Sequence, residues 1–306
     1  MKSSMHPIVL TVSTGRCGTT FLEKSFRASF GNESNWITHE HLKQQVTRVG
    51  KYHRCYDESV QSEMVNDQIQ ELLNKWRSLS ETGPIVDFGW TMRSLIPYFY
   101  RQLGDQLRVL YVHRHPIEVA ASFKLIGNYS IYHSEDWAIT PYHPNAMYPQ
   151  FASRWDSMTP FEKCLYYWLE VNASAEELRR TYPSLKLMEL KSSDLFRSDT
   201  VLDKIVQFTG FDCYAKPIVR SRERNRREIF LLERRPIRQE WGHYQRHPEM
   251  IEFAERLGYD MSPEFVADLI RKYQLPRGVV PWLRHRSGFW AFKEWVGKSL
   301  RKVGLR

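Results

Sequence analysis

Six residues near the start of the chain have the types and spacing of an anion-binding turn. They read Gly15-Arg16-Cys17-Gly18-Thr19-Thr20 and connect an apolar run to an amphipathic segment. A glycine-bearing turn between a strand and a helix brings backbone N–H groups together around an anion. A nucleotide-triphosphate loop would read G-x-x-x-x-G-K-[ST], but here the only basic residue precedes the second glycine and two threonines follow it. The turn therefore predicts an oxyanion site of another kind.

A second segment, LRVLYVHRHPIEVAASF, repeats this plan further along the chain. Residues 107–112 predict an apolar strand, the following turn carries Arg114, and a helix begins near Pro116, a residue type favoured in the first turn. Ser122 lies two turns into that helix. Since ligands bind beyond the carboxyl ends of parallel strands, we expect the two turns to open on the same side of a sheet. Two anion sites there suit a ligand with phosphates at both ends.

Strands and helices alternate along most of the chain. Apolar and β-branched runs predict strands at 8–13, 85–88, 107–112 and 185–190. Amphipathic spacing predicts helices at 19–30, 65–79, 161–182 and 199–211, besides the one that begins near Pro116. This alternation implies a parallel sheet covered on both faces. We therefore expect an α/β fold, a P-loop-like three-layer sandwich with a central parallel sheet flanked by helices.

Taken together, the two turns resemble the signatures of sulfotransferases that use 3′-phosphoadenosine 5′-phosphosulfate (PAPS). The first signature, [PG]-[KR]-[ST]-G-[ST]-[ST]-[FLW] between a strand and a helix, stands here as residues 15–21. The second, R-[DH]-P with a serine eight residues after the arginine, stands as Arg114-His115-Pro116 and Ser122. A weaker likeness to the carbohydrate, tyrosyl-protein and bacterial branches extends through Asp194-Leu195 and residues 234–260. The resemblance thus covers residues 7–261 except for 127–160.

The resemblance implies an enzyme that moves a sulfuryl group from PAPS, its co-substrate, to an acceptor hydroxyl of a carbohydrate or glycolipid. No metal is expected, because the sulfuryl group carries less charge than a γ-phosphate. Arg16 would stabilise the charge that develops on the leaving 5′-phosphate. The loop would cradle the phosphosulfate, while Arg114 and Ser122 would hold the 3′-phosphate. The expected cofactor-binding residues are Gly15, Arg16, Cys17, Gly18, Thr19, Thr20, Arg114 and Ser122.

The acceptor hydroxyl needs a base within hydrogen-bond reach. In relatives that use a carboxylate, a glutamate lies in the region of the segment THEH at 38–41. We therefore expect Glu40 as the base, with His39 as the second choice and Arg16 as the further catalytic residue.

Other interpretations of these residues remain open. Asp87, Trp90 and Arg93 follow the second strand and could face the acceptor, although a structural role is favoured for them. Two positions depart from the family pattern, since Cys17 stands in place of Ser or Thr and His115 in place of the commoner Asp. A nucleotide kinase or another P-loop phosphotransferase is the alternative function, but it should carry Gly-Lys-Ser/Thr and a carboxylate for magnesium. A binding module without catalysis should have lost Arg16.

The formal net charge of +9 is concentrated at one end of the chain. Residues 276–306 hold eight Lys or Arg and one acid, and the stretch 282–306 alternates aromatic residues and cations at helical spacing. We therefore expect a sulfotransferase domain at 1–275 and a basic amphipathic tail at 276–306. Such a helix could contact an anionic membrane through 282–306, or it could pack its apolar side on the domain.

Composition and the remaining segments set the cellular context. Four scattered cysteines without a C-x-x-C pair indicate a reducing compartment, and there is no apolar run of about 18 residues for a spanning helix. We therefore expect a cytoplasmic protein, which the tail could bring to the inner face of a membrane. Residues 127–160, which lack periodicity, predict a long surface loop or lid. The expected partner is a hydroxyl-bearing sugar or glycolipid and not nucleic acid, and the oligomeric state stays open.

Overall fold

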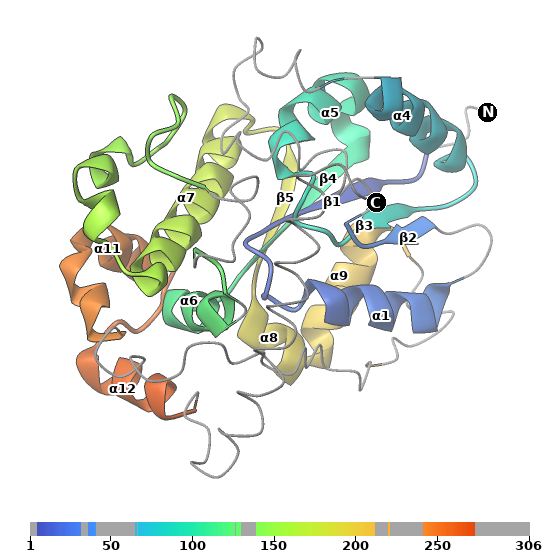
Figure 1. Cartoon of the computed structure of the whole chain (residues 1–306). Helices are drawn as coiled ribbons and strands as arrows, with labels where there is room; N and C mark the ends of the chain where they lie inside the picture. Colours follow the sequence, from blue (N-terminus) through green and yellow to red (C-terminus); the bar gives the residue numbers. More distant parts are fainter. Residues whose placement is uncertain are drawn as a thin grey trace, which may run out of the picture. The chain divides into compact units, whose positions relative to one another are not determined.

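Figure 1 shows the computed structural model of the chain, which describes residues 5–31, 36–40, 65, 67–125, 127–129, 139–211, 220 and 241–272. The chain divides into two compact units. The first comprises Met1–Arg114, Ile139–Gln150 and Glu170–Asn225, and the second comprises His115–Ala138, Phe151–Leu169 and Arg226–Arg306. The predicted domain boundary at residue 275 and the predicted tail at 276–306 lie outside the described residues, so both stay predictions.

The first unit is built on a five-stranded sheet with the strand order β2-β3-β1-β4-β5. The strands are β1 Ile8–Ser13, β2 Trp36–Thr38, β3 Ile85–Asp87, β4 Leu107–His113 and β5 Lys186–Lys191. All neighbouring strands pair in parallel, and β1 in the middle pairs with β4 from Ile8↔Leu107 to Ser13↔Val112. Every residue of β1 is buried, as expected of a central parallel strand with an almost unbroken apolar and β-branched sequence. The predicted parallel α/β sheet is confirmed.

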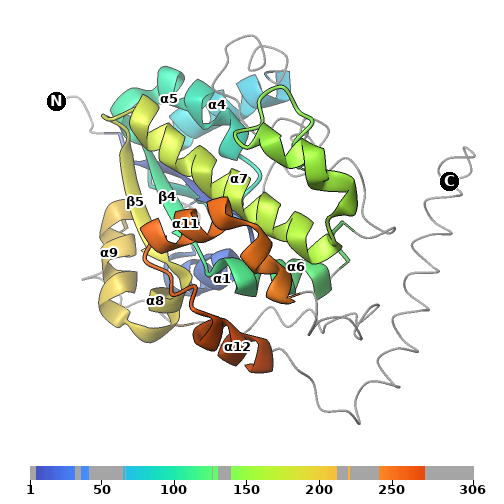
Figure 2. The ribbon, with the colours of Figure 1, turned by 90° about the vertical axis from the view of Figure 1, so that its left-hand side faces the viewer.

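Helices cover both faces of this sheet (Figures 1 and 2). On one face lie α4 Asp67–Leu79 and α5 Ile96–Leu103, whose Trp76 and Phe99 pack in one buried cluster with Leu10 of β1. On the other lie α1 Thr19–Phe30, α8 Ser192–Arg197 and α9 Asp199–Thr209. Here Phe26 of α1 contacts Phe88 and Phe211, with ring centroids 4.9 and 5.4 Å apart. Burying each such side chain stabilises the fold by roughly 1.5–3 kcal/mol. Because helices pack on both faces, the predicted arrangement of a sheet flanked by helices is confirmed.

The second unit is helical and has an aromatic core. Its helices are α6 Pro116–Leu125, α11 Pro248–Arg256, α12 Pro263–Lys272 and the first half of α7 Pro160–Thr181, with 3₁₀ helix η5 Gly242–Arg246. Phe161 of α7 stacks on Trp241, with centroids 5.4 Å apart and planes 10° apart. Trp168 of α7 meets Phe253 of α11 edge to face at 5.8 Å, where the two helices lie together in Figure 2.

A capping box begins α7 and ties it to α11. Thr159 N donates to Glu162 Oε2 at 2.9 Å, and Glu162 N donates to Thr159 Oγ1 at 3.3 Å. His247, which directly precedes α11, places Nε2 3.1 Å from Glu162 Oε1. Burial alone would raise the pKa of Glu162, but the hydrogen bonds from His247 and Thr159 outweigh it and hold the pKa at about 2. The carboxylate therefore stabilises the helix start as an anion.

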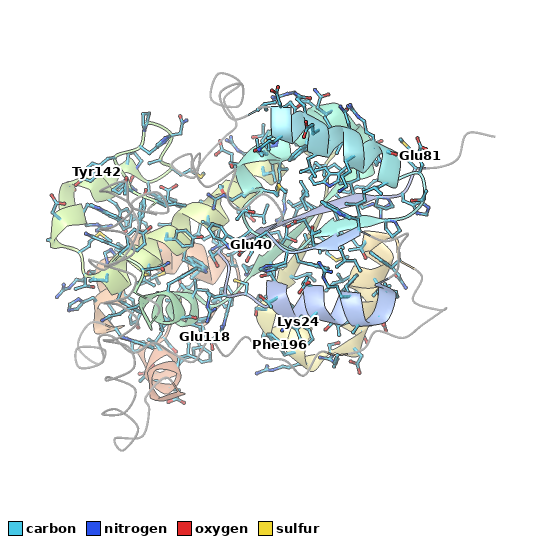
Figure 3. The ribbon with its side chains drawn as sticks, turned by 45° about the vertical axis from the view of Figure 1, so that its right-hand side comes forward. Lys24, Glu40, Glu81, Glu118, Tyr142 and Phe196 are labelled. Atoms are coloured by element: carbon cyan, nitrogen blue, oxygen red, sulfur yellow. The ribbon has the colours of Figure 1, made fainter. Side chains whose placement is uncertain are left out.

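Part of the segment 127–160, predicted as a surface loop or lid, is packed structure instead. Residues Pro149–Ser157 form the 3₁₀ helix η4, in which Phe151 and Trp155 are buried. Phe151 stacks on His247 at 5.6 Å, and Trp155 contacts Tyr166 at 5.2 Å. The prediction was wrong here because a 3₁₀ helix lacks the 3.6-residue spacing that marks an α-helix. Residues 130–138 lie outside the described part, while Tyr142 is exposed (Figure 3).

Candidate active site

The turn after β1 has a backbone that only a glycine-rich sequence adopts easily. Gly15, Arg16 and Gly18 have φ of 77°, 60° and 96°, all in the left-handed region. Gly18 directly precedes α1 and offers no side chain to cap it, and the first turn of α1 holds no acidic residue. The N–H groups at this helix start therefore suit an external anion, as does the positive end of the helix dipole.

Cys17 belongs to the scaffold of this turn. Its side chain is fully buried, Sγ donates to Gly15 O at 3.2 Å, and Thr14 Oγ1 lies 3.1 Å from the same sulfur. Burial raises the pKa of the Cys17 thiol, which keeps it protonated and able to donate. The thiol thus holds the turn from inside, which explains how cysteine can replace the usual hydroxyl residue. Of the predicted Cys17 contacts to a ligand, only the backbone N–H is compatible with this position.

Arg114 joins the second turn to the first. It follows β4, the neighbour of β1, and its Nη1 donates to the carbonyl oxygen of Arg16 at 3.2 Å. A guanidinium has five N–H donors in a planar fork, so a bond to the turn still leaves the group able to address an oxyanion. The parallel register of β1 and β4 thus brings both predicted anion-binding turns to the same edge of the sheet.

The short strand β2 brings His39 and Glu40 to this edge. Both residues directly follow Thr38, the last residue of β2, and β2 pairs in parallel with β3. His39 Nε2 lies 3.2 Å from Thr19 Oγ1, a residue of the predicted phosphosulfate cradle. The structure therefore places His39 in contact with the predicted phosphosulfate loop, and Glu40 is its neighbour in the chain.

Glu40 is held in place by two residues that follow β3. Trp90 Nε1 donates to Glu40 Oε1 at 2.6 Å. The backbone of Glu40 packs on Gly89 so closely that a Cβ added to Gly89 would come within 2.2 Å of Glu40 N. Figure 3 shows Glu40 beyond the ends of the strands. Sequence reasoning missed the role of Gly89, for which the only signal was a glycine soon after a predicted strand.

Asp87 fixes the two strands whose ends carry these residues. It is fully buried, its Oδ2 accepts from Thr38 Oγ1 at 2.7 Å, and its Oδ1 accepts from Gly89 N at 2.6 Å. The main-chain oxygen of Asp87 accepts from Thr11 Oγ1 at 2.9 Å. A residue whose carboxylate bonds β2 and the turn after β3, and whose main-chain oxygen bonds β1, is structural, in agreement with the favoured interpretation of Asp87.

The two predicted catalytic residues Arg16 and Glu40 share an uncommon backbone conformation. Their φ angles are 60° and 56°, and Tyr129 is the only other non-glycine residue with positive φ in the described ranges. Such a conformation costs of order 1–3 kcal/mol and persists where the surrounding structure enforces it, which occurs often at functional sites. The strain is thus an observation, independent of any motif, that points to these two positions.

An aromatic pair flanks the turn. Phe196 of α8 is 53% exposed, although it is a large apolar side chain, and its ring centroid lies 4.9 Å from that of Phe21 (Figure 3). A Cβ added to Gly18 would lie 3.2 Å from Phe196 Cζ, so the ring borders the predicted anion-binding turn. Exposed aromatic rings offer flat faces on which a nucleobase can stack. The sequence signal that could have found Phe196 is its position directly after Asp194-Leu195.

A network of hydrogen bonds supports the end of β4, next to Arg114. His113, fully buried, places Nε2 3.1 Å from Glu189 Oε1 on β5, and Arg179 Nη2 bonds Glu189 Oε2 at 2.5 Å. The hydrogen bond from His113 is the largest cause that lowers the pKa of Glu189 to about 2, with Arg179 adding to it against burial. This network links β4 to β5 next to Arg114.

Ser122 and His115 belong to the second unit. Ser122 is buried on α6, and its predicted pairing with Arg114 around a 3′-phosphate stays a prediction. His115 Nδ1 accepts from Ile117 N at 3.3 Å, and Nε2 lies 3.0 Å from Asp260 O. By accepting from the N–H of Ile117, the His115 side chain caps the start of α6 as an aspartate would. This explains the departure from Asp at position 115.

Comparison with solved structures shows a likeness in fold. No protein-family model and no curated protein matches the chain. Among solved structures, the chain is similar to the sulfotransferase domain of the olefin synthase from Synechococcus PCC 7002, with 16% sequence identity and a TM-score of 0.47. The match covers 85% of this chain and 98% of that domain. At this identity and overlap, the likeness assigns no role to any residue.

Within the described ranges, no group of three or more His, Cys, Asp and Glu side chains is arranged to hold a metal ion. In the same part of the chain, none of the helices combines the length and apolar character needed to cross a bilayer.

Proposed function

We propose that the protein is a PAPS-dependent sulfotransferase. The hydrogen bond from Arg114 to the carbonyl of Arg16 is the observation that supports this most, because it joins two anion-binding turns at one sheet edge. A single adenine nucleotide with a 3′-phosphate and a 5′-phosphosulfate would address both turns. Phe196 and Phe21 beside the loop supply aromatic faces for its base.

In the proposed reaction, Glu40 removes the proton from an acceptor hydroxyl as the oxygen attacks sulfur. The new O–S bond forms while the bond between sulfur and the bridging phosphate oxygen breaks. Negative charge then develops on the 5′-phosphate, where Arg16 and the N–H groups at the start of α1 stabilise it. The products are the sulfated acceptor and adenosine 3′,5′-bisphosphate.

Glu40 is the preferred base over His39 because of the contacts each makes. His39 Nε2 is occupied by Thr19, whereas Glu40 is fixed by Trp90 in a strained conformation at the end of β2. Trp90 itself orients Glu40 through its indole N–H. The resemblance to the carbohydrate branch of the PAPS-dependent sulfotransferases favours a carbohydrate or glycolipid hydroxyl as the acceptor.

Thermal unfolding with nucleotides tests the proposal and the kinase alternative. Adenosine 3′,5′-bisphosphate at about a hundred times its dissociation constant should stabilise the fold by roughly 2.7 kcal/mol. ATP with magnesium should change the Tm little, because the turn lacks the lysine of a nucleotide-triphosphate loop. A larger stabilisation by ATP with magnesium than by the bisphosphate would favour the kinase instead.

A further inference from the structure

Two polar side chains between β3 and α5 hold buried atoms that have no hydrogen-bond partner in the part of the chain that the structure describes. They are Thr91, of which Oγ1 is buried, and Arg93, of which Nε and Nη1 are buried. Thr91 is only 5% exposed. Burying donors without acceptors is costly, and native proteins leave few such groups except where an ion or ligand binds.

Arg93 differs from the other arginines that have a buried unpaired nitrogen. Arg108 and Arg154 each leave only Nε unpaired, while their Nη atoms bind Phe208 O and Glu249 respectively. An arginine cannot shed its charge by deprotonation. Arg93 therefore keeps a full positive charge for which the described residues supply no anion.

The surroundings of Arg93 make this charge more unfavourable. Arg93 opens the 3₁₀ helix Arg93–Leu95, which continues directly into α5, and the first turn of α5 carries no acid. A cation at the N-terminal end of a helical segment is repelled by the helix dipole, whereas an anion there is attracted. The two carboxylates of this sheet edge bind other donors, since Asp87 accepts from Thr38 and Gly89, and Glu40 accepts from Trp90.

The position in the fold places these groups on the acceptor side of the proposed reaction. They follow the carboxyl end of β3, in the same turn as Gly89 and Trp90, which hold Glu40. The donor nucleotide is assigned to the ends of β1 and β4, where Arg16 and Arg114 lie. We infer that Thr91 and Arg93 form an oxyanion subsite for the acceptor, which would then carry a carboxylate, sulfate or phosphate near its reacting hydroxyl. This inference rests on the proposed function and narrows it to an acidic acceptor.

The test measures binding of inorganic sulfate to the full chain with adenosine 3′,5′-bisphosphate at saturation and the ionic strength held constant with chloride. The wild-type protein should bind sulfate, and Arg93→Gln should weaken it by about tenfold or more. Thr91→Val, which keeps the side-chain volume, should weaken it less. Arg101→Gln, which removes an exposed arginine from α5, is the matched control and should bind as the wild type does. Equal sulfate affinity in wild type and Arg93→Gln, or no binding by wild type, would overturn the inference.

Two readouts separate this inference from the proposed function. The affinity of Arg93→Gln for the bisphosphate should equal that of wild type, and a clear loss would assign Arg93 to the donor and overturn the acceptor subsite. If the wild-type protein does not bind the bisphosphate, the proposed function is wrong. The sulfate titration of wild type and Arg93→Gln is then repeated without nucleotide, and it tests the anion site independently of that function. If Arg93→Gln does not fold, Arg93→Lys replaces it, because lysine keeps the charge but lacks the planar guanidinium that binds two oxygens at once. Weaker sulfate binding by folded Arg93→Lys than by wild type would then support the subsite, and equal binding would overturn it.

Discussion

Replacing Gly89 with alanine would move the backbone of Glu40 and so test whether the position of this carboxylate decides turnover. The added Cβ would lie 2.2 Å from Glu40 N and 2.5 Å from Glu40 Cα. Because ordinary van der Waals contact begins near 3.4 Å, the distance between this Cβ and Glu40 N must grow from 2.2 Å by about 1.2 Å, which displaces Glu40. A misplacement of about 1 Å can cost roughly 100-fold in rate, or about 2.7 kcal/mol of transition-state stabilisation. We therefore expect kcat of Gly89→Ala to fall by about 100-fold.

Transfer from radiolabelled PAPS to an acceptor fraction selected with the wild-type protein measures this loss. Bisphosphate affinity should stay close to that of wild type, since the new Cβ meets Glu40 and Asp87 and not the phosphate-binding turn. The indole N–H resonance of Trp90, assigned with Trp90→Phe, reports whether the contact with Glu40 has changed. Gly242→Ala is the control, because no described residue beyond its chain neighbours lies within 4 Å of the added Cβ and its φ is not positive. A folded Gly89→Ala protein with wild-type turnover would refute the reasoning.

Three further predictions address the charged residues. Arg16→Ala should abolish transfer while substantial bisphosphate binding remains, because Arg16 acts mainly on charge that develops in the transition state; equal losses in binding and turnover would contradict this. Glu40→Gln should remove turnover with nucleotide affinity intact, and His39→Ala should be milder, whereas the reverse order would assign the base to His39. The folded-state pKa of Glu162, about 2, lies below its ordinary value of 4.5, so its stabilisation of about 3 kcal/mol is present above pH 4.5 and lost as the pH falls through 2. Acid unfolding should therefore show a steeper loss of stability across this window in wild type than in Glu162→Gln, and identical profiles would exclude the role.

Those parts of the fold that rest on local sequence were predictable. The first strand and the helix after it have the predicted bounds, 8–13 and 19–30, because an apolar run, a glycine turn and an amphipathic run follow one another without competition. The glycines at 15 and 18 predict a tight turn between the strand and the helix, and both have left-handed φ angles there. Local pattern and tertiary structure agree in this region.

The parts that depend on contacts between distant residues were not predictable. Strand β2 has only three residues, Trp36–Thr38, too few to show an alternating pattern, and its pairing with β3 is what makes it a strand. Because β2 could not be predicted, nothing in the local sequence indicated that Glu40 meets Trp90, which lies 50 residues later. For the same reason, nothing indicated that Gly89 must lack a side chain. The η4 helix was also missed because contacts between distant residues stabilise it: its aromatic side chains pack on α7 and on His247.

The preference of the protein for adenosine 3′,5′-bisphosphate over AMP tests most directly whether the two turns form one nucleotide site. The ratio of the two dissociation constants isolates the 3′-phosphate, and it is measured by calorimetric titration in the wild-type protein and in Arg114→Ala. A lost charge-assisted contact of about 2 kcal/mol corresponds to roughly 30-fold, so the wild type should prefer the bisphosphate by about that factor and Arg114→Ala should lose most of the preference. Equal affinity for both nucleotides in the wild type, or an undiminished preference in Arg114→Ala, would contradict the site.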